Sequence, residues 1–337
     1  MITATIYSIL ACLFWGFIFV APLYLAQFDC IDIVLGRFLA FGIGSLVSLS
    51  YSLFRQRDWQ LLRYWKEASL CGIVMNLCYF TALTAGMRLS NPSLITLIVG
   101  LAPILIIALT CGTKKGDMPY STLLGPGLCI FLGIALLNIE TLQANWQAYS
   151  GWQYIEGILC GLFALGAWSW YVIYNTKLLQ KNPTIQPTGW TSLIGVVTLI
   201  FTIIAALFRW KTIDPIYAQL FSFEQQGILF LTSSLVLGLL CSLFAFSLWN
   251  IASAKLPSAL SGQLAILETV FGLVLINLFE HHIPSPIEMT GILCILGGVW
   301  RGLYRYTQRN SKFGNLAKSA PKISIRPKAD TRGAPYL

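Results

Sequence analysis

Two stretches of equal length resemble each other in this chain: CGIVMNLCYFTALTAGMRLSNPSL at residues 71–94 and LGLLCSLFAFSLWNIASAKLPSAL at residues 237–260. Aligned without gaps, they place Gly72 on Gly238 and Phe80 on Phe246. Each stretch contains the end of one long apolar run and the beginning of the next. Similarity that recurs at a fixed spacing indicates an internal repeat, so we expect the protein to consist of two related halves.

Apolar runs of this kind fill most of both halves. Of the 337 residues, 56% are hydrophobic and only 10% are charged, whereas soluble domains carry roughly 25% charged residues. A run of about 20 apolar residues crosses a bilayer as a helix, because lipid offers no water to satisfy open backbone groups. The expected helices are 4–25, 31–54, 68–87, 92–111, 120–138, 153–175, 188–208, 227–250, 257–279 and 287–306.

The ten runs fall into two matching sets of five, and a second copy of an odd-numbered block must insert upside down. The first helices of the two halves align with Trp15 on Trp168, early in each helix. We therefore predict an all-α polytopic membrane protein whose ten transmembrane helices form two inverted five-helix repeats, residues 1–150 and 151–306. The second half holds about twelve extra residues, which we expect in the loop around Asp214 to Gln226. Residues 307–337 are predicted to be a basic, disordered tail.

The distribution of positive charge predicts the orientation. With both termini in the cytoplasm, 18 of the 22 Lys and Arg residues lie on the inner side and three on the outer side. Short cytoplasmic loops normally carry this excess, so we expect a protein of the inner (plasma) membrane. Nine of the positive charges lie from Arg301 onward, which favours contact of the tail with anionic lipids and not with nucleic acid. The alternative is that the tail only enforces the topology.

Several motifs resemble the EamA family of the drug/metabolite transporter superfamily, and they keep its order from residue 4 to about residue 306. They are the Trp-Gly pair at 15–16, LGRFLAFGIGSL at 35–46, NPSLITLIVGLAPILIIAL at 91–109 and the segment 256–299 with Glu268 and its late glycines. The resemblance implies a central cavity lined by helices 1, 3, 4, 6, 8 and 9, and movement of metabolites, commonly efflux of amino acids. One departure is that Thr269 follows Glu268 where the family often has proline. The kink that this proline would produce is therefore not implied.

Two charged residues lie at membrane depth, where each costs several kcal/mol unless it is paired or solvated. Glu268 is near the middle of its helix, and it is expected either to exchange a coupling proton or bind a substrate amine, or else to hold two helices together. Arg37 lies about two turns into the second helix. It is expected either to bind an anionic substrate group or form a gate, or else to reach the outer interface beside Asp29 and Asp32.

Uncharged side chains complete the candidate site. Trp15, Trp168 and Trp170 lie inside apolar runs, where an indole wants a hydrogen-bond partner or a ligand to stack against, and ordinary packing is the alternative. Asn76, Tyr79 and Asn250 are expected to line a wet cavity or to join helices. Trp152, Trp190 and Trp300 are near helix ends and are expected in interfacial belts.

These patterns predict a secondary active transporter that moves a small organic metabolite by alternating access, and the family resemblance implies most simply an exporter of an amino acid or a related compound. The alternatives are an uptake or exchange carrier for a nucleoside, a sulfonium compound or a sugar phosphate, and a membrane scaffold without transport. No catalytic, phosphate-binding or cysteine-rich metal motif occurs in the sequence, so no enzyme activity, cofactor or metal is expected. Protons are a possible coupling ion.

Overall fold

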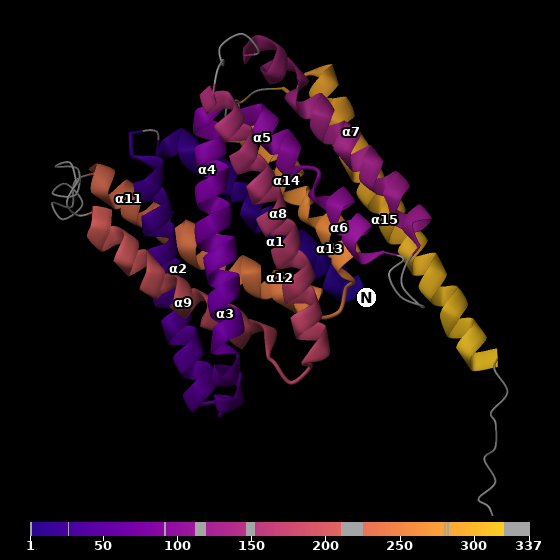
Figure 1. Cartoon of the computed structure of the whole chain (residues 1–337), viewed down its shortest axis with the longest axis horizontal. Helices are drawn as coiled ribbons and strands as arrows, with labels where there is room; N and C mark the ends of the chain where they lie inside the picture. The colour runs from indigo at the N-terminus through magenta and orange to yellow at the C-terminus, as the bar shows by residue number, and fades with distance from the viewer. Residues whose placement is uncertain are drawn as a thin grey trace, which may run out of the picture.

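The computed structural model describes residues 2–25, 27–90, 92–111, 119–145, 152–209, 225–279, 281 and 283–319. All regular structure in these residues is helical, and each of the ten predicted runs forms a helical segment (Figure 1). The segments of the first half are α1 (Ile2–Tyr24); α2 (Cys30–Phe54); η1 (Trp59–Tyr64), α3 (Trp65–Gly72), η2 (Ile73–Tyr79) and α4 (Phe80–Leu89) in one run; α5 (Pro92–Val99) with α6 (Ala102–Thr110); and α7 (Tyr120–Asn145). Those of the second half are α8 (Trp152–Lys181); α9 (Pro187–Arg209); α11 (Gln225–Leu235), η4 (Val236–Phe244) and α12 (Ala245–Ser253) in one run; α13 (Ser258–Ala265) with α14 (Leu267–Phe279); and α15 (Pro286–Ser319).

The surface and the interior have the polarity of a membrane protein. Seven helical stretches of the described residues are long and apolar enough to cross a membrane, and the shorter Ile2–Ile18 and Leu94–Thr110 are also apolar. Large apolar side chains face outward, as shown by Val47 and Phe208, which are 69% and 79% exposed. Polar side chains such as Asn250 are fully buried. Only a surrounding hydrocarbon phase makes such a surface stable, so the chain is a helical membrane protein.

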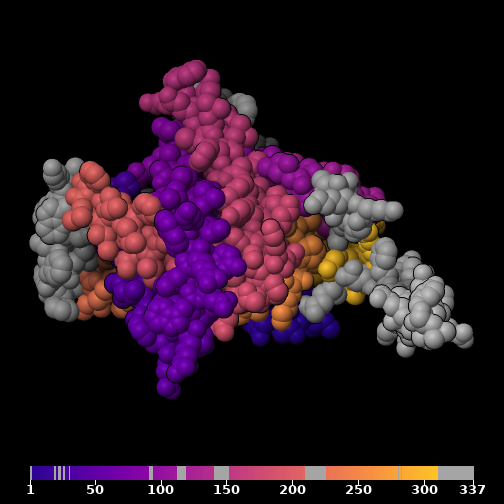
Figure 2. All heavy atoms as spheres, turned by 60° about the horizontal axis from the view of Figure 1, so that its bottom comes forward, coloured from indigo at the N-terminus to yellow at the C-terminus, as the bar shows by residue number. Residues whose placement is uncertain are grey.

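The packing of the helices is related between the two halves. The mates α2 and α9 pack against each other, and so do α7 and α15, which lie side by side along the right edge of Figure 1. Helix α1 packs against α12 and α14, whereas α8, its mate in the second half, packs against α4, α5 and α6. Figure 2 shows residues 59–89, in purple, beside α8, in magenta. Helices that the sequence alignment pairs thus make corresponding contacts.

Glycines allow α7 and α15 to touch at two points. A Cβ at Gly133 would lie 2.6 Å from the Gly291 carbonyl oxygen, and one at Gly298 would lie 2.8 Å from that of Pro126. A shift of 165 residues, which also places Cys129 on Cys294, aligns Gly133 with Gly298 and Pro126 with Gly291, so the two contacts are equivalent in that register. Small residues at these crossings let the backbones approach closely, which is how helices associate in lipid.

Substitution of Gly133 by Leu is expected to destabilise the fold, since the added side chain meets a backbone carbonyl that cannot move aside. Overpacking of this kind typically costs about 1–3 kcal/mol. Gly297→Leu is the matched control, because a Cβ at Gly297 meets nothing within 4 Å. Thermal unfolding in detergent should show a lower midpoint for Gly133→Leu alone, and equal midpoints would contradict the close packing.

The structure corrects two boundaries. The helical run of the third segment begins at Trp59 and not near residue 68, and α15 continues to Ser319, so the predicted disorder from residue 307 is wrong at least to that point. The extension is reasonable, because residues 307–319 contain no proline and Pro321 is the first residue that cannot continue a helix. The predicted loop residue Asp214 and the tail from residue 320 lie outside the described residues.

Candidate functional site

Two helices in the middle of the protein are interrupted at positions that the repeat relates. Helix α5 ends at Val99 and α6 begins at Ala102, whereas α13 and α14 are separated at Ile266. The alignment of the two halves carries Gly100 onto Ile266. Pro103 in the first turn of α6 explains the first break, because proline has no amide hydrogen to donate to the preceding turn. Such breaks leave backbone N–H and C=O groups without a helical hydrogen bond in the middle of a membrane-spanning segment. These groups are tolerated there only where they face other parts of the protein or a water-filled cavity.

The break in the ninth segment occurs although Thr269 replaces the proline of the family. The amide of Thr269 donates to the Ile266 carbonyl at 3.1 Å, which is a tighter turn than an α-helix. The thiol of Cys12 donates a hydrogen bond to the Leu264 carbonyl oxygen, with 3.3 Å between sulfur and oxygen. It thus gives a hydrogen-bond partner to one of the last carbonyl groups of α13, which have none within the helix. Glu268 consequently lies in the first turn of α14, where the helix dipole favours a negative charge.

The two breaks border a cavity of about 380 Å³ between the halves. Its wall includes residues from the six helices that the family resemblance implied, together with Arg37 of α2 and Ile134 of α7. Five of the predicted site residues line it, namely Trp15, Arg37, Tyr79, Trp168 and Glu268. Thr84, Thr96 and Thr269 add hydroxyl groups that the sequence analysis did not single out.

Arg37 contributes the positive charge of the cavity wall. Its side chain is 5% exposed, its Nε donates to Ser242 Oγ at 2.9 Å, and its guanidinium lies 5.2 Å from the centre of the Phe80 ring. The alternative interpretation placed Arg37 at the outer interface beside Asp29 and Asp32, and no ion pair within 4.0 Å joins Arg37 to either carboxylate. Asp29 instead forms an ion pair with Arg88 at 3.1 Å.

Glu268 contributes a negative charge to the same cavity. Its side chain is partly accessible, and no hydrogen bond joins its carboxylate to another residue of the described part of the chain. Among these residues no ion pair within 4.0 Å joins Glu268 to Arg37. Since both line one cavity, their charges act on its contents without neutralising each other by direct contact.

Aromatic rings form another part of the cavity wall. The repeat mates Trp15 and Trp168 meet edge to face, with ring centres 6.4 Å apart. Trp168 also contacts Tyr79 at 5.6 Å, and Trp15 contacts Phe246 at 5.0 Å. The buried indole nitrogen of Trp15 has no acceptor among the described residues. The cavity thus combines flat apolar surfaces with opposite charges.

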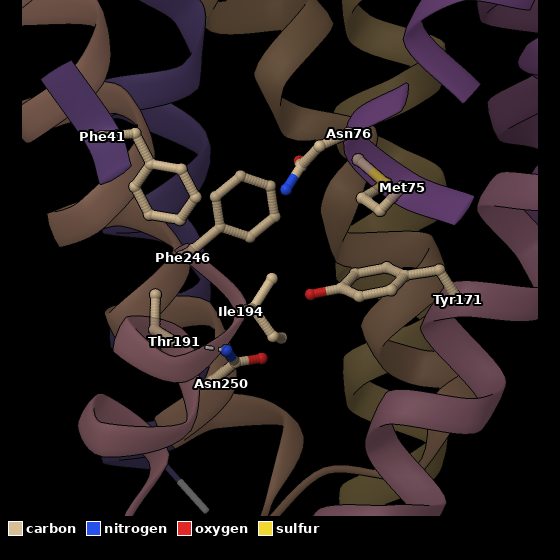
Figure 3. A pocket seen from close by; sticks show the side chains of 8 residues that line it. All are labelled: Phe41, Met75, Asn76, Tyr171, Thr191, Ile194, Phe246 and Asn250. Carbon is tan, nitrogen blue, oxygen red and sulfur yellow. Dashed lines mark hydrogen bonds between the residues drawn. The ribbon is translucent and has the colours of Figure 1, made fainter. Parts of the chain in front are cut away.

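Asn76 and Asn250 lie beside this cavity and not in its wall. Both line a neighbouring space of about 10 Å³, together with Tyr171 and Thr191 (Figure 3). That volume holds about one water molecule at most. Phe246 lines both this small space and the large cavity. The amide groups of Asn76 and Asn250 lie between helices.

Hydrogen bonds confirm that these asparagines join helices. Asn250 accepts from Asn175 Nδ2 and donates to Thr191 Oγ1, both at 2.8 Å, while the indole of Trp190 donates to Asn175. This network links α8, α9 and α12, and its members are at most 1% exposed. Trp190, which was expected in an interfacial belt, is wholly buried, whereas Trp152 and Trp300 are exposed.

The repeat relates two further hydrogen bonds across the halves. Asn76 Nδ2 donates to Thr198 Oγ1 of α9 at 2.7 Å, and the repeat mate of Asn76 is Ser242, the partner of Arg37 in α2. In each case, a side chain of the third helix of one half forms a hydrogen bond with a side chain of the second helix of the other half. Ser242 was not foreseen, although the alignment of the halves places it on Asn76.

Trp170 is the third predicted residue that lies outside the cavity. Its ring stacks on Tyr174, with centres 4.8 Å apart, and both line a separate groove beside α3 and α6. Trp168 and Trp170 are two positions apart in α8 and cannot share one face of a helix.

Comparisons with known proteins agree with this architecture. The chain is 29% identical over 307 residues to the inner membrane protein YtfF of Escherichia coli (strain K12), with 89% of this chain and 94% of that protein covered. A solved structure described as "Crystal structure of protein" superposes with a TM-score of 0.69 at 18% identity and covers 89% of this chain and 96% of its own. A sequence model described as the EamA-like transporter family matches residues 2–139 and 155–301. The chain belongs to the EamA-like transporter family.

Proposed function

We propose that this protein is a secondary active transporter for a small zwitterionic metabolite, an amino acid or a related compound, and that it most simply works as an exporter. The observation that carries the proposal is the presence of Arg37 and Glu268 in one aromatic cavity without an ion pair between them. A guanidinium binds a carboxylate through a fork of two hydrogen bonds. A carboxylate at the other position binds an ammonium group, and the rings accommodate an apolar side chain.

Alternating access follows from the paired construction of the halves. In this proposal the ten helices form two inverted repeats, and the breaks at Gly100 and Ile266 are the points at which the halves rock about the cavity. The π-helices η2 and η4 support the same relation, since the alignment of the halves carries 73–79 onto 239–245. A scaffold without transport would not require charges facing a cavity at mid-depth.

Counterflow in proteoliposomes tests the substrate class. The sharpest panel contains an apolar amino acid, the amine that remains when its carboxylate is removed, and the acid that remains when its ammonium group is removed. We expect the zwitterion to exchange and both truncated compounds to compete at least about tenfold less well, since each loses a charge-assisted hydrogen bond of about 1.5 kcal/mol or more. Equal competition by one truncated compound would contradict the role of the charge that it lacks.

The same panel separates the alternatives within transport. A nucleoside lacks both charges and a sugar phosphate is a polyanion, for which Arg37 is the single Lys or Arg in the described lining. Sulfonium compounds that keep an amino-acid group belong in the panel, because they also present a carboxylate and a cation. Uptake and efflux use the same site and are distinguished by imposing opposite proton gradients.

The orientation gives a separate prediction. Both termini are expected in the cytoplasm, so a membrane-impermeant thiol reagent applied to intact cells should label Cys30 and should not label a cysteine introduced at Ser319. The control is permeabilised cells, in which both should react. Labelling of the introduced cysteine in intact cells would reverse the orientation of every helix.

A further inference from the structure

A second space of about 630 Å³ lies on the outside of the bundle, between the η1–α3 run, α6 and α8. One end is bordered by Tyr64, whose hydroxyl donates to Asn182 Oδ1 at 3.2 Å. At the other end is Gly166, where a Cβ would meet nothing within 4 Å. Leu109, on the α6 wall, is 54% exposed. The groove is therefore open to the surroundings of the protein and is not a packing defect of its core.

The groove wall changes in chemical character along α8. Gly166 is the lining residue of α8 that lies farthest from the end of the helix, and Leu105 and Leu109 line the groove from the facing helix α6. Next come the stacked rings of Trp170 and Tyr174. Lys177 and Lys181 follow, at the end of the helix. This order of apolar, aromatic and cationic groups is the order of acyl chain, interface and phosphate in one leaflet of a bilayer.

The length of the groove fits one leaflet. Helix α8 extends about 22 Å from Gly166 to Lys181 at the rise of an α-helix. Half of a bilayer with its head groups is roughly 20 to 22 Å thick. A lipid whose phosphate lies at Lys181 thus has its acyl chain beside Gly166.

The charge of the groove selects the kind of lipid. Lys177 and Lys181 form no ion pair within 4.0 Å with any residue of the described ranges, and Glu67 lies on the opposite wall. The end of the groove therefore carries one net positive charge. We propose that it binds a phospholipid with one net negative charge, of the phosphatidylglycerol type. The lysines hold the phosphate, the two aromatic rings lie at the interface, and Gly166 leaves room for the chain.

Substitution of Ser169 tests whether the groove binds a lipid or is part of the path of the transported solute. Ser169 lines the groove and is 1% exposed, and its buried hydroxyl has no hydrogen-bond partner among the described residues. A polar solute passing through the groove would use this hydroxyl, whereas an acyl chain would not. Ser169→Ala is therefore expected to leave both lipid binding and counterflow unchanged. A raised KM for counterflow in this variant, with lipid binding unaffected, would assign the groove to the solute.

Native mass spectrometry of the purified full chain, titrated with phosphatidylglycerol, phosphatidylethanolamine or phosphatidylcholine, tests the site. We expect phosphatidylglycerol to bind tightest and the double variant Lys177→Gln/Lys181→Gln to bind it about tenfold or more weakly, at about 1 kcal/mol for each lysine. Lys255→Gln, which removes another exposed lysine at a helix end, is the charge control and should change binding less than about twofold.

A steric pair of variants tests the acyl-chain end without altering charge. Gly166→Phe fills the Gly166 end of the groove and should weaken phosphatidylglycerol binding, whereas Gly297→Phe, at an equally open glycine of α15, should not. Size-exclusion chromatography verifies that each variant is folded. Equal phosphatidylglycerol binding by the wild type and the lysine double variant would overturn the proposal, as would a preference for phosphatidylethanolamine or phosphatidylcholine.

Discussion

Glu268→Gln is expected to abolish transport driven by a pH gradient while the protein folds normally. Glu268 faces the cavity without a hydrogen bond or ion pair to the rest of the described chain, so its replacement by an amide of similar shape removes charge and leaves the packing unchanged. Its repeat mate is Ala102, which also lines the cavity. The charge is therefore present in one half only, as expected of a site and not of a structural element used twice.

The two roles proposed for Glu268 give different results in counterflow. If the carboxylate carries the coupling proton, Glu268→Gln loses gradient-driven transport and keeps substrate exchange. If it binds the substrate ammonium group, exchange weakens as well, by about 30-fold or more, because loss of one partner of a buried charge pair costs about 2 kcal/mol or more. Glu156→Gln, outside the cavity lining, is the matched control. Wild-type rates in both assays would show that Glu268 is structural.

Arg37→Gln is expected to weaken substrate binding by about 10- to 100-fold, since hydrogen bonds to charged groups contribute about 1.5–3 kcal/mol. The guanidinium lies at the cavity wall, held by Ser242 and by the faces of Phe38 and Phe80. Arg37→Lys should restore only part of the affinity, because a lysine keeps the charge and loses the planar fork. Competition by unlabelled substrate in counterflow measures both variants.

The selectivity of the Arg37 variants separates binding from structure. If Arg37 holds the carboxylate, Arg37→Gln should no longer distinguish the zwitterion from the amine that lacks its carboxylate. Ser242→Ala is the companion variant, because it removes the contact that positions the guanidinium and keeps the charge. A uniform loss for all compounds, accompanied by a lower melting temperature, would instead indicate that Arg37 stabilises the packing of α2 against η4.

The positions of the helices could be predicted from the residues alone. A run of about 20 apolar residues can be recognised without knowing which helices it packs against. Its length and apolar character are set by the thickness of the membrane and not by the fold. The alignment of the halves predicted the equivalence of Phe80 and Phe246, and both line the cavity. Charges at membrane depth are costly, so Arg37 and Glu268 could be singled out by their position in apolar runs.

Which polar side chains face the cavity depends on how the helices pack, and the residues alone did not specify it. Asn76 and Asn250 had the same appearance in the sequence as Tyr79, since each was a polar residue in an apolar run. Asn250 lies beside Asn175 of another helix and Asn76 beside Thr198, and these partners come from segments far away in the chain. A hydrogen bond between helices depends on their rotation and spacing. The rotation and spacing of the helices are set by contacts such as the one between Gly133 and Gly291. The periodicity and composition of the sequence do not specify these contacts.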